Sequence, residues 1–128
     1  MALLNLKKKL PKLTKNFSES EFSCPCCGNS EIDSEFVFKL QELRTSCNFS
    51  FKVNSGWRCE EYNTKISKKS MGDHTRGLAV DIHLNDRYKR ATFLQYALSM
   101  GYFKDIAISK TFIHLGRGKS KQGVGVYG

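Results

Sequence analysis

The spacing of apolar residues predicts a short helical turn and then a longer helix in the first third of the chain. Residues 18–21, Ser-Glu-Ser-Glu, fit a capping box, so a turn is expected near residues 17–22. A helix is predicted to start at Asp33 or Ser34 and to end near Ser46. Its apolar residues recur at three- and four-residue steps and share one face: Phe36, Val37, Leu40, Leu43 and Cys47.

Two more helices are expected further along the chain. Residues 60–67 are polar and compatible with a helix. Residues 87–100 carry apolar side chains at core spacing, with Asp86 as the cap and Gly101 directly after them. A capping aspartate and a terminal glycine are typical of a helix start and stop.

Strands are predicted between and after these helices. Residues 49–53 alternate apolar and polar side chains, which indicates a strand that runs on toward Ser55. Residues 78–84 predict a buried strand, and residues 106–108 and 111–115 predict two more. The glycine-rich tail, residues 123–128, is either a last strand or a linker.

The predicted strand at residues 78–84 has two different faces. Because side chains alternate along a strand, Ala79, Asp81 and His83 share one face. The other face is wholly apolar and consists of Leu78, Val80, Ile82 and Leu84. Asp81 is therefore expected to emerge on the side away from the core.

The order of elements predicts an α+β fold with a small, mostly antiparallel sheet flanked by helices. Several strands are adjacent in sequence, and the connections are too irregular for a doubly wound sheet. A length of 128 residues fits about one domain. We expect residues 1–16 to be a basic N-terminal arm or linker and residues 17–128 to be one domain.

Charge narrows the range of partners. The chain has 21 Lys and Arg against 12 Asp and Glu, a formal charge of +9, which favours polyanionic partners such as anionic cell-wall polymers. Nucleic acid is not expected as a partner, because no nucleic-acid-binding motif accompanies the lysines and they are spread along the chain. The apolar runs are shorter than the roughly 18 residues of a membrane span, so no span is expected.

The N-terminal residues do not resemble a signal peptide. Apolar residues come first and five lysines follow within the first 15 residues, whereas a signal peptide places its positive charge before the apolar stretch. We therefore expect synthesis in the cytoplasm.

Three residues form a candidate metal site: His74, Asp81 and His114. Two imidazoles and one carboxylate make up a ligand set typical of catalytic zinc, which keeps one coordination position open for water. A structural zinc would normally have a fourth protein ligand. The sequence therefore predicts one catalytic Zn²⁺ ion.

Five cysteines, an odd number, cannot all be paired within the chain. Three of them form a knuckle, Cys24, Cys26 and Cys27, and Cys59 is the fourth candidate. A second, structural metal ion, a disulfide to Cys59 and simple buried thiols all remain open, although Cys-x-Cys-Cys is tighter than the usual Cys-x-x-Cys pair. A reducing compartment favours thiols or metal over disulfides.

Several segments resemble one known family. Residues 74–81 match the His-x-x-Gly-x-Ala-x-Asp signature of zinc D-alanyl-D-alanine carboxypeptidases and the related L-alanyl-D-glutamate endopeptidases, many of which are phage endolysins. Residues 54–59 are similar to the family's Ser-Gly-Tyr-Arg-Cys strand end. Residues 101–114 are similar to its closing segment, in which a Gly-Phe element leads to the last histidine. The resemblance covers roughly residues 17–117.

The resemblance implies roles and a fold. It implies that His74, Asp81 and His114 bind zinc and that Arg58 holds a carboxylate of the peptide substrate, as a planar guanidinium can do bidentately. It also implies the fold shared by these peptidases and the zinc-bearing signalling domain of hedgehog proteins.

Three positions depart from the family pattern. Gly72 stands where a serine is common, Gly116 where an aspartate is common, and Thr111 where related dipeptidases carry a catalytic glutamate. The general base is therefore unassigned. By chemistry alone the candidates are Asp105, His83 and Asp73, and His83 shares a strand face with Asp81 about 7 Å along it.

We therefore expect a zinc metallopeptidase that hydrolyses amide bonds in the peptide stems of peptidoglycan, as a D-Ala-D-Ala carboxypeptidase or an L-Ala-D-Glu endopeptidase. Cell-wall degradation by a phage or prophage product, or by a virion component, suits this activity. The alternative is a non-catalytic zinc-containing binding or structural module of the same fold, motivated by Thr111 and Gly116.

Overall fold

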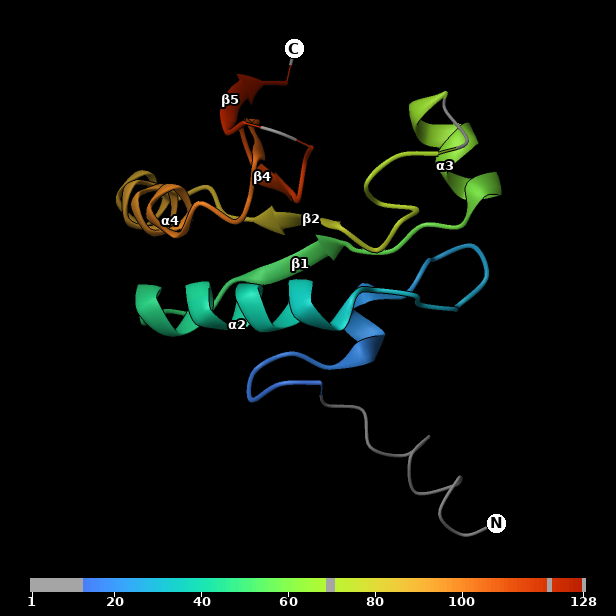
Figure 1. Ribbon diagram of the computed structural model, residues 1–128, viewed down its shortest axis with the longest axis horizontal. Coiled ribbons are helices and arrows are strands. Elements are labelled where there is room, and N and C mark those ends of the chain that lie inside the picture. Colours follow the sequence, from blue (N-terminus) through green and yellow to red (C-terminus); the bar gives the residue numbers. More distant parts are fainter. Residues whose placement is uncertain (1–12, 69–70, 120, 128) are drawn as a thin grey trace, which may run out of the picture.

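One sheet organises the part of the chain that the computed structural model describes, which is residues 13–68, 71–119 and 121–127. Its strands lie in the order β1-β2-β4-β3-β5 (Figure 1). All neighbours pair antiparallel except β3 and β5, which are parallel. The bounds are β1 Lys52–Ser55, β2 Ala79–His83, β3 Asp105–Ile108, β4 Phe112–Gly116 and β5 Gly123–Val126. The prediction of an α+β fold with a mostly antiparallel sheet is confirmed, and the tail forms an edge strand.

Helices cover the sheet and its ends. In Figure 1, α2 runs along β1, while α4 and α3 lie on opposite sides of β2. The bounds are η1 Glu19–Phe22, a 3-10 helix, α2 Ser34–Cys47, α3 Glu60–Ser67 and α4 Arg87–Met100. All four were predicted, with ends within a residue or two of those observed.

Local capping explains why the helix ends were predictable. The Asp33 side chain accepts a hydrogen bond from the backbone N–H of Phe36, and that of Asp86 accepts from the N–H groups of Tyr88 and Lys89. These bonds satisfy N–H groups that the first helical turn leaves unpaired. Gly101 ends α4 with φ of 68°, a conformation that glycine adopts without strain.

The strand predicted at residues 49–53 begins later, at Lys52. Phe51 lies edge-on to Phe93 of α4, with ring centroids 5.1 Å apart, and also packs against Phe17. Backbone pairing with β2 starts only at Lys52. The apolar–polar alternation of residues 49–51 therefore reflects the packing of aromatic side chains before the strand begins.

The two faces of the sheet differ as the sequence predicted. Val80 and Ile82 of β2 and Ile113 of β4 are fully buried in the core, on the side of α2 and α4. The alternate residues point to the other face. In the antiparallel register, Asp81 lies directly opposite His114, and Ser55 of β1 lies opposite Asp81. This register brings polar side chains from three strands into one row.

The predicted N-terminal arm is only partly covered, because residues 1–12 lie outside the described residues. Within the described part, Thr14 and Asn16 are bound to α2: the Thr14 hydroxyl and the Asn16 backbone N–H both donate to Gln41 Oε1, each at 2.8 Å. Residues next to the predicted boundary therefore contact the folded domain.

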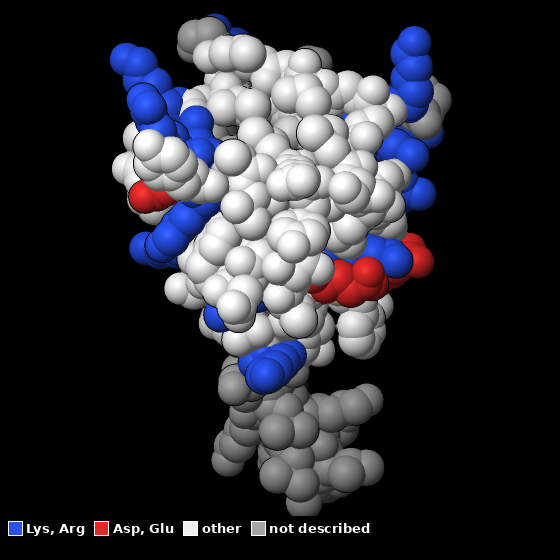
Figure 2. Space-filling model, turned by 90° about the vertical axis from the view of Figure 1, so that its left-hand side faces the viewer, with Lys and Arg blue, Asp and Glu red and all other residues white. Residues whose placement is uncertain are grey.

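The described part of the chain bears on the predictions about membrane spans and charge. Among the described residues, no helix is both long and apolar enough to cross a membrane. On the face shown in Figure 2, Lys and Arg side chains lie around the margin and a broad uncharged area fills the middle. Positive charge is therefore spread around this face.

Candidate metal centre

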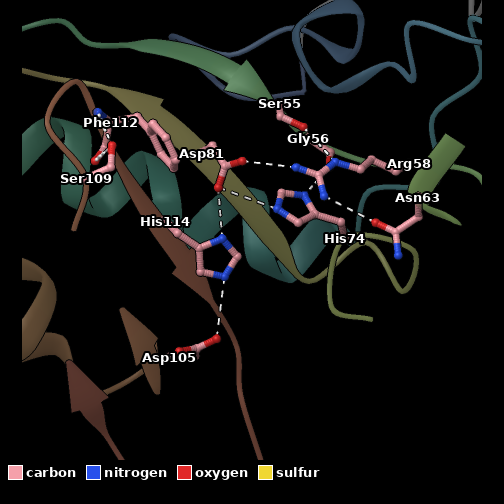
Figure 3. A network of polar contacts seen from close by, with 10 residues as sticks. All are labelled: Ser55, Gly56, Arg58, Asn63, His74, Asp81, Asp105, Ser109, Phe112 and His114. Atoms are coloured by element: carbon pink, nitrogen blue, oxygen red, sulfur yellow. Dashed lines mark hydrogen bonds and ion pairs between the residues drawn. The ribbon is translucent and has the colours of Figure 1, made fainter. Parts of the chain in front are cut away.

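Three buried polar side chains meet on the sheet face away from the core (Figure 3). Asp81 comes from β2, His114 from β4, and His74 from the loop that precedes β2. One ligand atom of each lies within 4.8 Å of the other two. An ion with bonds of about 2.0–2.2 Å to nitrogen and oxygen fits among atoms at such separations. The structure thus brings together the three predicted ligands.

A backbone carbonyl fixes the imidazole of His74. Its Nδ1 lies 2.7 Å from the carbonyl oxygen of Gly56, which can only accept, so Nδ1 carries the proton. Nε2 therefore presents its lone pair, and it lies 3.5 Å from Asp81 Oδ1. Holding the second ring nitrogen in this way is how proteins orient histidine ligands before a metal binds.

His114 has a carboxylate at each ring nitrogen. Its Nδ1 lies 2.8 Å from Asp81 Oδ1, and its Nε2 lies 3.5 Å from Asp105 Oδ2. Because an ionised carboxylate only accepts, Nδ1 donates to Asp81 in this structure, and Asp105 can accept a proton at Nε2 when Nδ1 gives up its own to bind a metal ion. Asp105 is thus placed to orient His114.

Asp81 divides its two oxygens between the histidines and an arginine. Oδ1 faces His74 and His114, while Oδ2 accepts a hydrogen bond from Arg58 Nη2 at 3.1 Å. Burial by itself raises the pKa of Asp81, but the contacts of its carboxylate with the His114 and His74 imidazoles outweigh burial and hold the pKa well below its usual range. The carboxylate is therefore ionised and ready to bind a cation.

Arg58, the predicted substrate ligand, is held by the protein on three sides. Besides Asp81, it donates from Nε to Ser55 Oγ at 3.1 Å and from Nη1 to Asn63 Oδ1 at 3.2 Å. Among the described residues, these bonds occupy three of its five N–H groups. Arg58 therefore braces a metal ligand and retains N–H groups for a further acceptor.

A hollow of about 270 Å³ opens beside these residues. It is close to the lower end of small-ligand pockets, roughly 300 Å³. Six of its lining residues have a charged, imidazole or phenol side chain: Arg58, Asp73, His74, Asp105, His114 and Tyr127. The candidate ligands are thus reachable from solvent despite their burial.

The three candidate bases are placed differently. Asp105 and Asp73 line the hollow. His83 is exposed and lines a separate hollow with Lys52 and Asp86 at the other end of β2. The shared strand face therefore does not bring His83 into the hollow of His74 and His114.

Gly116 makes room for Asp73. A Cβ at this position would lie 2.9 Å from Asp73 Oδ2 and 3.2 Å from His114 Nε2. Asp73 Oδ2 also accepts a hydrogen bond from the backbone N–H of Gly118 at 3.2 Å. The absence of a side chain at Gly116 therefore leaves room for the Asp73 carboxylate from the loop before β2.

Sequence reasoning missed Tyr127 and the carbonyl of Gly56. The Tyr127 ring lies edge-on to His114, with centroids 6.2 Å apart, and tilted against Phe112 at 5.3 Å. Burial, with the nearby charge of Asp81, raises the pKa of Tyr127 and keeps its hydroxyl protonated. Only the parallel pairing of β5 with β3 brings Tyr127 here, and no local motif signals that pairing.

The four candidate cysteines also come together, near the N-terminus of α3. All five cysteines of the chain are free thiols, and Cys24 Sγ lies 3.7 Å from Cys59 Sγ. The sulfur atoms of Cys24, Cys27 and Cys59 lie within 4.8 Å of one another. The fifth cysteine, Cys47, is buried in α2, where burial raises its pKa to about 11.

Comparison with known proteins supplies the family. No curated protein matches the chain. Residues 13–116 match the family model described as Peptidase M15, and this span contains Arg58, His74, Asp81 and His114. The match covers most of the chain, so the protein belongs to the peptidase M15 family of zinc metallopeptidases.

Proposed function

We propose that this protein is a zinc peptidase that hydrolyses amide bonds in the stem peptides of peptidoglycan. The observation that carries the proposal is the convergence of three ligand atoms within 4.8 Å of one another at the wall of a hollow that Arg58 also lines. Membership of the peptidase M15 family supports the class of reaction.

The residues present fit a catalytic zinc ion. His74 Nε2, Asp81 Oδ1 and His114 Nδ1 are a nitrogen and oxygen donor set, and among the described residues these three ligands converge there. When bound, zinc supplies a Lewis acid that polarises a carbonyl and lowers the pKa of water. Gly56 holds His74 in the tautomer that suits this task, and Asp105 would accept a proton from His114 Nε2 once Nδ1 bound the ion.

The position of Arg58 favours a substrate that carries a carboxylate next to the bond to be cut. Its two remaining N–H groups can bind such a carboxylate, while Asp81, Ser55 and Asn63 hold the guanidinium in place. Stem peptides offer this group at a terminal D-alanine and at D-glutamate. Both a D-Ala-D-Ala carboxypeptidase and an L-Ala-D-Glu endopeptidase fit this geometry.

The Tyr127 hydroxyl is our proposed donor to the oxygen that gains negative charge during hydrolysis. It lines the hollow beside His114, and its raised pKa keeps it protonated at neutral pH. Asp105 acts through His114 Nε2 as a positioning residue in this proposal.

The net charge of +9 supports a cell-wall setting. A basic protein is attracted to the anionic polymers of the wall, and this attraction weakens as salt rises. Delivery as a phage or prophage product, or as part of a virion, would bring it to that substrate.

A second candidate function is a zinc-containing binding module without peptidase activity. It is favoured by the position of the acidic side chains: Asp105 lies at Nε2 of His114, on the far side of the ring from the ligand atom Nδ1, and Thr111 does not line the hollow. Under this proposal the ion and Arg58 would hold a peptide carboxylate without cleaving the chain.

The experiment uses the purified full chain, loaded with zinc, on isolated peptidoglycan, with released fragments identified by mass spectrometry. We expect zinc-dependent release, and its loss in the double variant His74→Ala/His114→Ala. Free D-alanine would identify the carboxypeptidase and new N-terminal D-glutamate the endopeptidase. Zinc bound at full occupancy with no release from any stem would favour the binding module.

A further inference from the structure

A second group of potential ligands consists only of sulfur atoms. It joins two segments that are 35 residues apart: the loop that carries Cys24, Cys26 and Cys27, and Cys59, the N-cap residue of α3. Cys24 is 1% exposed, Cys59 is half-buried, and the other two are exposed. The cluster is separate from the hollow that contains His74 and His114.

The separations suit a tetrahedral ion. With zinc–sulfur bonds of about 2.3 Å, two sulfur ligands of one tetrahedral ion lie about 3.8 Å apart. Cys24 Sγ and Cys59 Sγ are 3.7 Å apart. Cys27 Sγ lies within 4.8 Å of both. A small rotation of its exposed side chain would place all three sulfur atoms at the separations of a tetrahedral site.

The cysteine loop is shaped before any ion binds. Its ends are closed by hydrogen bonds from Cys24 N to the Asn29 carbonyl at 2.7 Å and from Gly28 N to the Cys24 carbonyl at 2.8 Å. Gly28 adopts φ of 78°, which favours glycine. The two loop sulfur atoms grouped most closely with Cys59 are those of Cys24 and Cys27, which have the common Cys-x-x-Cys spacing.

Backbone N–H groups face two of the sulfur atoms. Cys59 Sγ accepts from the N–H of Tyr62 at 3.4 Å, in the first turn of α3. The backbone of Cys59, Cys26 and Cys27 donates to the sulfur of Cys24. Thiolates rather than thiols are the form that binds metal.

We propose that Cys24, Cys27 and Cys59 bind a structural Zn²⁺ ion and that Cys26 provides the fourth thiolate. Cys26 Sγ now lies 3.7 Å from Glu61 Oε1 at the exposed edge of the cluster, within reach of the remaining position. A set of four thiolates selects zinc over the harder divalent cations, and it leaves no open position for water.

This ion would fasten the wall of the hollow. Cys59 directly follows Arg58, and α3, which Cys59 caps, carries Asn63, the acceptor for Arg58 Nη1. The residues just before the cysteine loop already contact the residue before Arg58, since Trp57 N donates to the Phe22 carbonyl at 2.8 Å. A metal cross-link between the loop and the helix start would limit the movement of Arg58 relative to Asp81.

The test counts metal in the purified full chain, prepared under reducing conditions with zinc. We expect two zinc ions per chain in the wild type and one in His74→Ala/His114→Ala, in which the cysteines are intact. Adding Cys27→Ser to that double variant should remove the remaining ion. Adding Cys47→Ser instead, at a cysteine buried in α2, should leave it bound.

Cobalt gives a readout that is independent of peptidase activity. Co²⁺ bound to His74→Ala/His114→Ala should show the near-ultraviolet charge-transfer absorption of cobalt thiolates, and this band should be lost with Cys27→Ser. The proposal is overturned if the double variant binds no zinc and shows no band, or if its intact mass reveals a Cys24–Cys59 disulfide. These measurements need no cysteine variant to fold. Unchanged zinc affinity in Cys26→Ser would overturn the four-thiolate assignment.

Discussion

The histidine cluster and the cysteine cluster are built on different kinds of scaffold. Asp81 and His114 lie opposite each other on paired strands, and the residues His74, Asp81 and His114 are each at most 9% exposed. The cysteines come from a loop and a helix start, and Cys26 and Cys27 are exposed. Strand register therefore fixes the first cluster, whereas the second depends on a hydrogen-bonded loop and a helix start that an ion would join.

The two clusters also differ in what surrounds the donor atoms. Around the histidines, Gly56, Asp105 and Arg58 contact the far atoms of the ligands, and a hollow opens beside them. Around the cysteines, the neighbours of sulfur are mainly other sulfur atoms and backbone N–H groups. The comparison teaches that one site is arranged to expose an ion to substrate and the other to enclose one.

The change Asp81→Asn should have the largest effect. It removes a metal ligand and leaves Arg58, whose side chain is 12% exposed, without its charged partner. Peptidase activity should fall below detection, and breaking a buried pair should lower the free energy of unfolding by about 3 kcal/mol. Urea denaturation of the metal-free protein measures the second effect. Zinc bound at the cysteines should be unaffected.

Lowering the pH should reduce the difference in unfolding free energy between the wild type and Asp81→Asn. The pKa of Asp81 is lowered in the folded protein, so its contribution to stability is present above the unfolded pKa of about 3.9 and is lost as the pH falls below it. Stability of wild type and Asp81→Asn should converge in acid. A constant difference down to the lowest usable pH would contradict the ion pair.

Arg58→Lys should reduce kcat/KM about 100-fold, because an ammonium group cannot hold Asp81, Ser55 and Asn63 and still bind a carboxylate bidentately. Most of the loss should be in KM if Arg58 binds the substrate. Arg76→Lys, at the more exposed Arg76 beside Asp73, is the matched control and should change activity little. A loss confined to kcat would limit Arg58 to bracing Asp81.

Asp105→Asn should weaken zinc binding at the histidine cluster about tenfold, at the low end for a group that orients a metal ligand, because Asp105 is itself exposed. Zinc titration in competition with a chelator measures this, with the cysteine ion as an internal reference. If Asp105 were instead the general base, affinity would be retained and the acid limb of the pH profile of kcat would disappear.

Tyr127→Phe should have the smallest effect, about a tenfold loss in kcat with KM unchanged, which corresponds to one hydrogen bond to a charged oxygen. Tyr96→Phe, on α4, is the control. Equal activity of the two variants would exclude the Tyr127 hydroxyl from the reaction and leave its ring as packing for His114.

Helix ends were predictable because their signals are local, and the three candidate ligands were predicted from short motifs. Asp86 and Gly101 bound α4 in the sequence as they do in the structure. The residues that support the ligands were less accessible to sequence reasoning. The Gly56 carbonyl is a backbone group with no side-chain signature, and Tyr127 reaches the hollow only because β5 joins the far edge of the sheet.

The role of Gly116 could not be interpreted from sequence, because the atom that fills the space beside it belongs to Asp73, 43 residues earlier by position number. Likewise, the close grouping of Cys24 and Cys27 with Cys59 became visible only once the position of Cys59 was known.

The pairing of β2 with β4 has a consequence for the fidelity of folding. Shifting one strand by a single residue would turn Asp81 into the core and Val80 into water, because side chains alternate between the faces. Such a misaligned chain would bury a carboxylate among apolar side chains, a costly error. Burial of Val80, Ile82 and Ile113 thus disfavours the shifted pairing. The register that buries these three side chains is also the one that places Asp81 opposite His114.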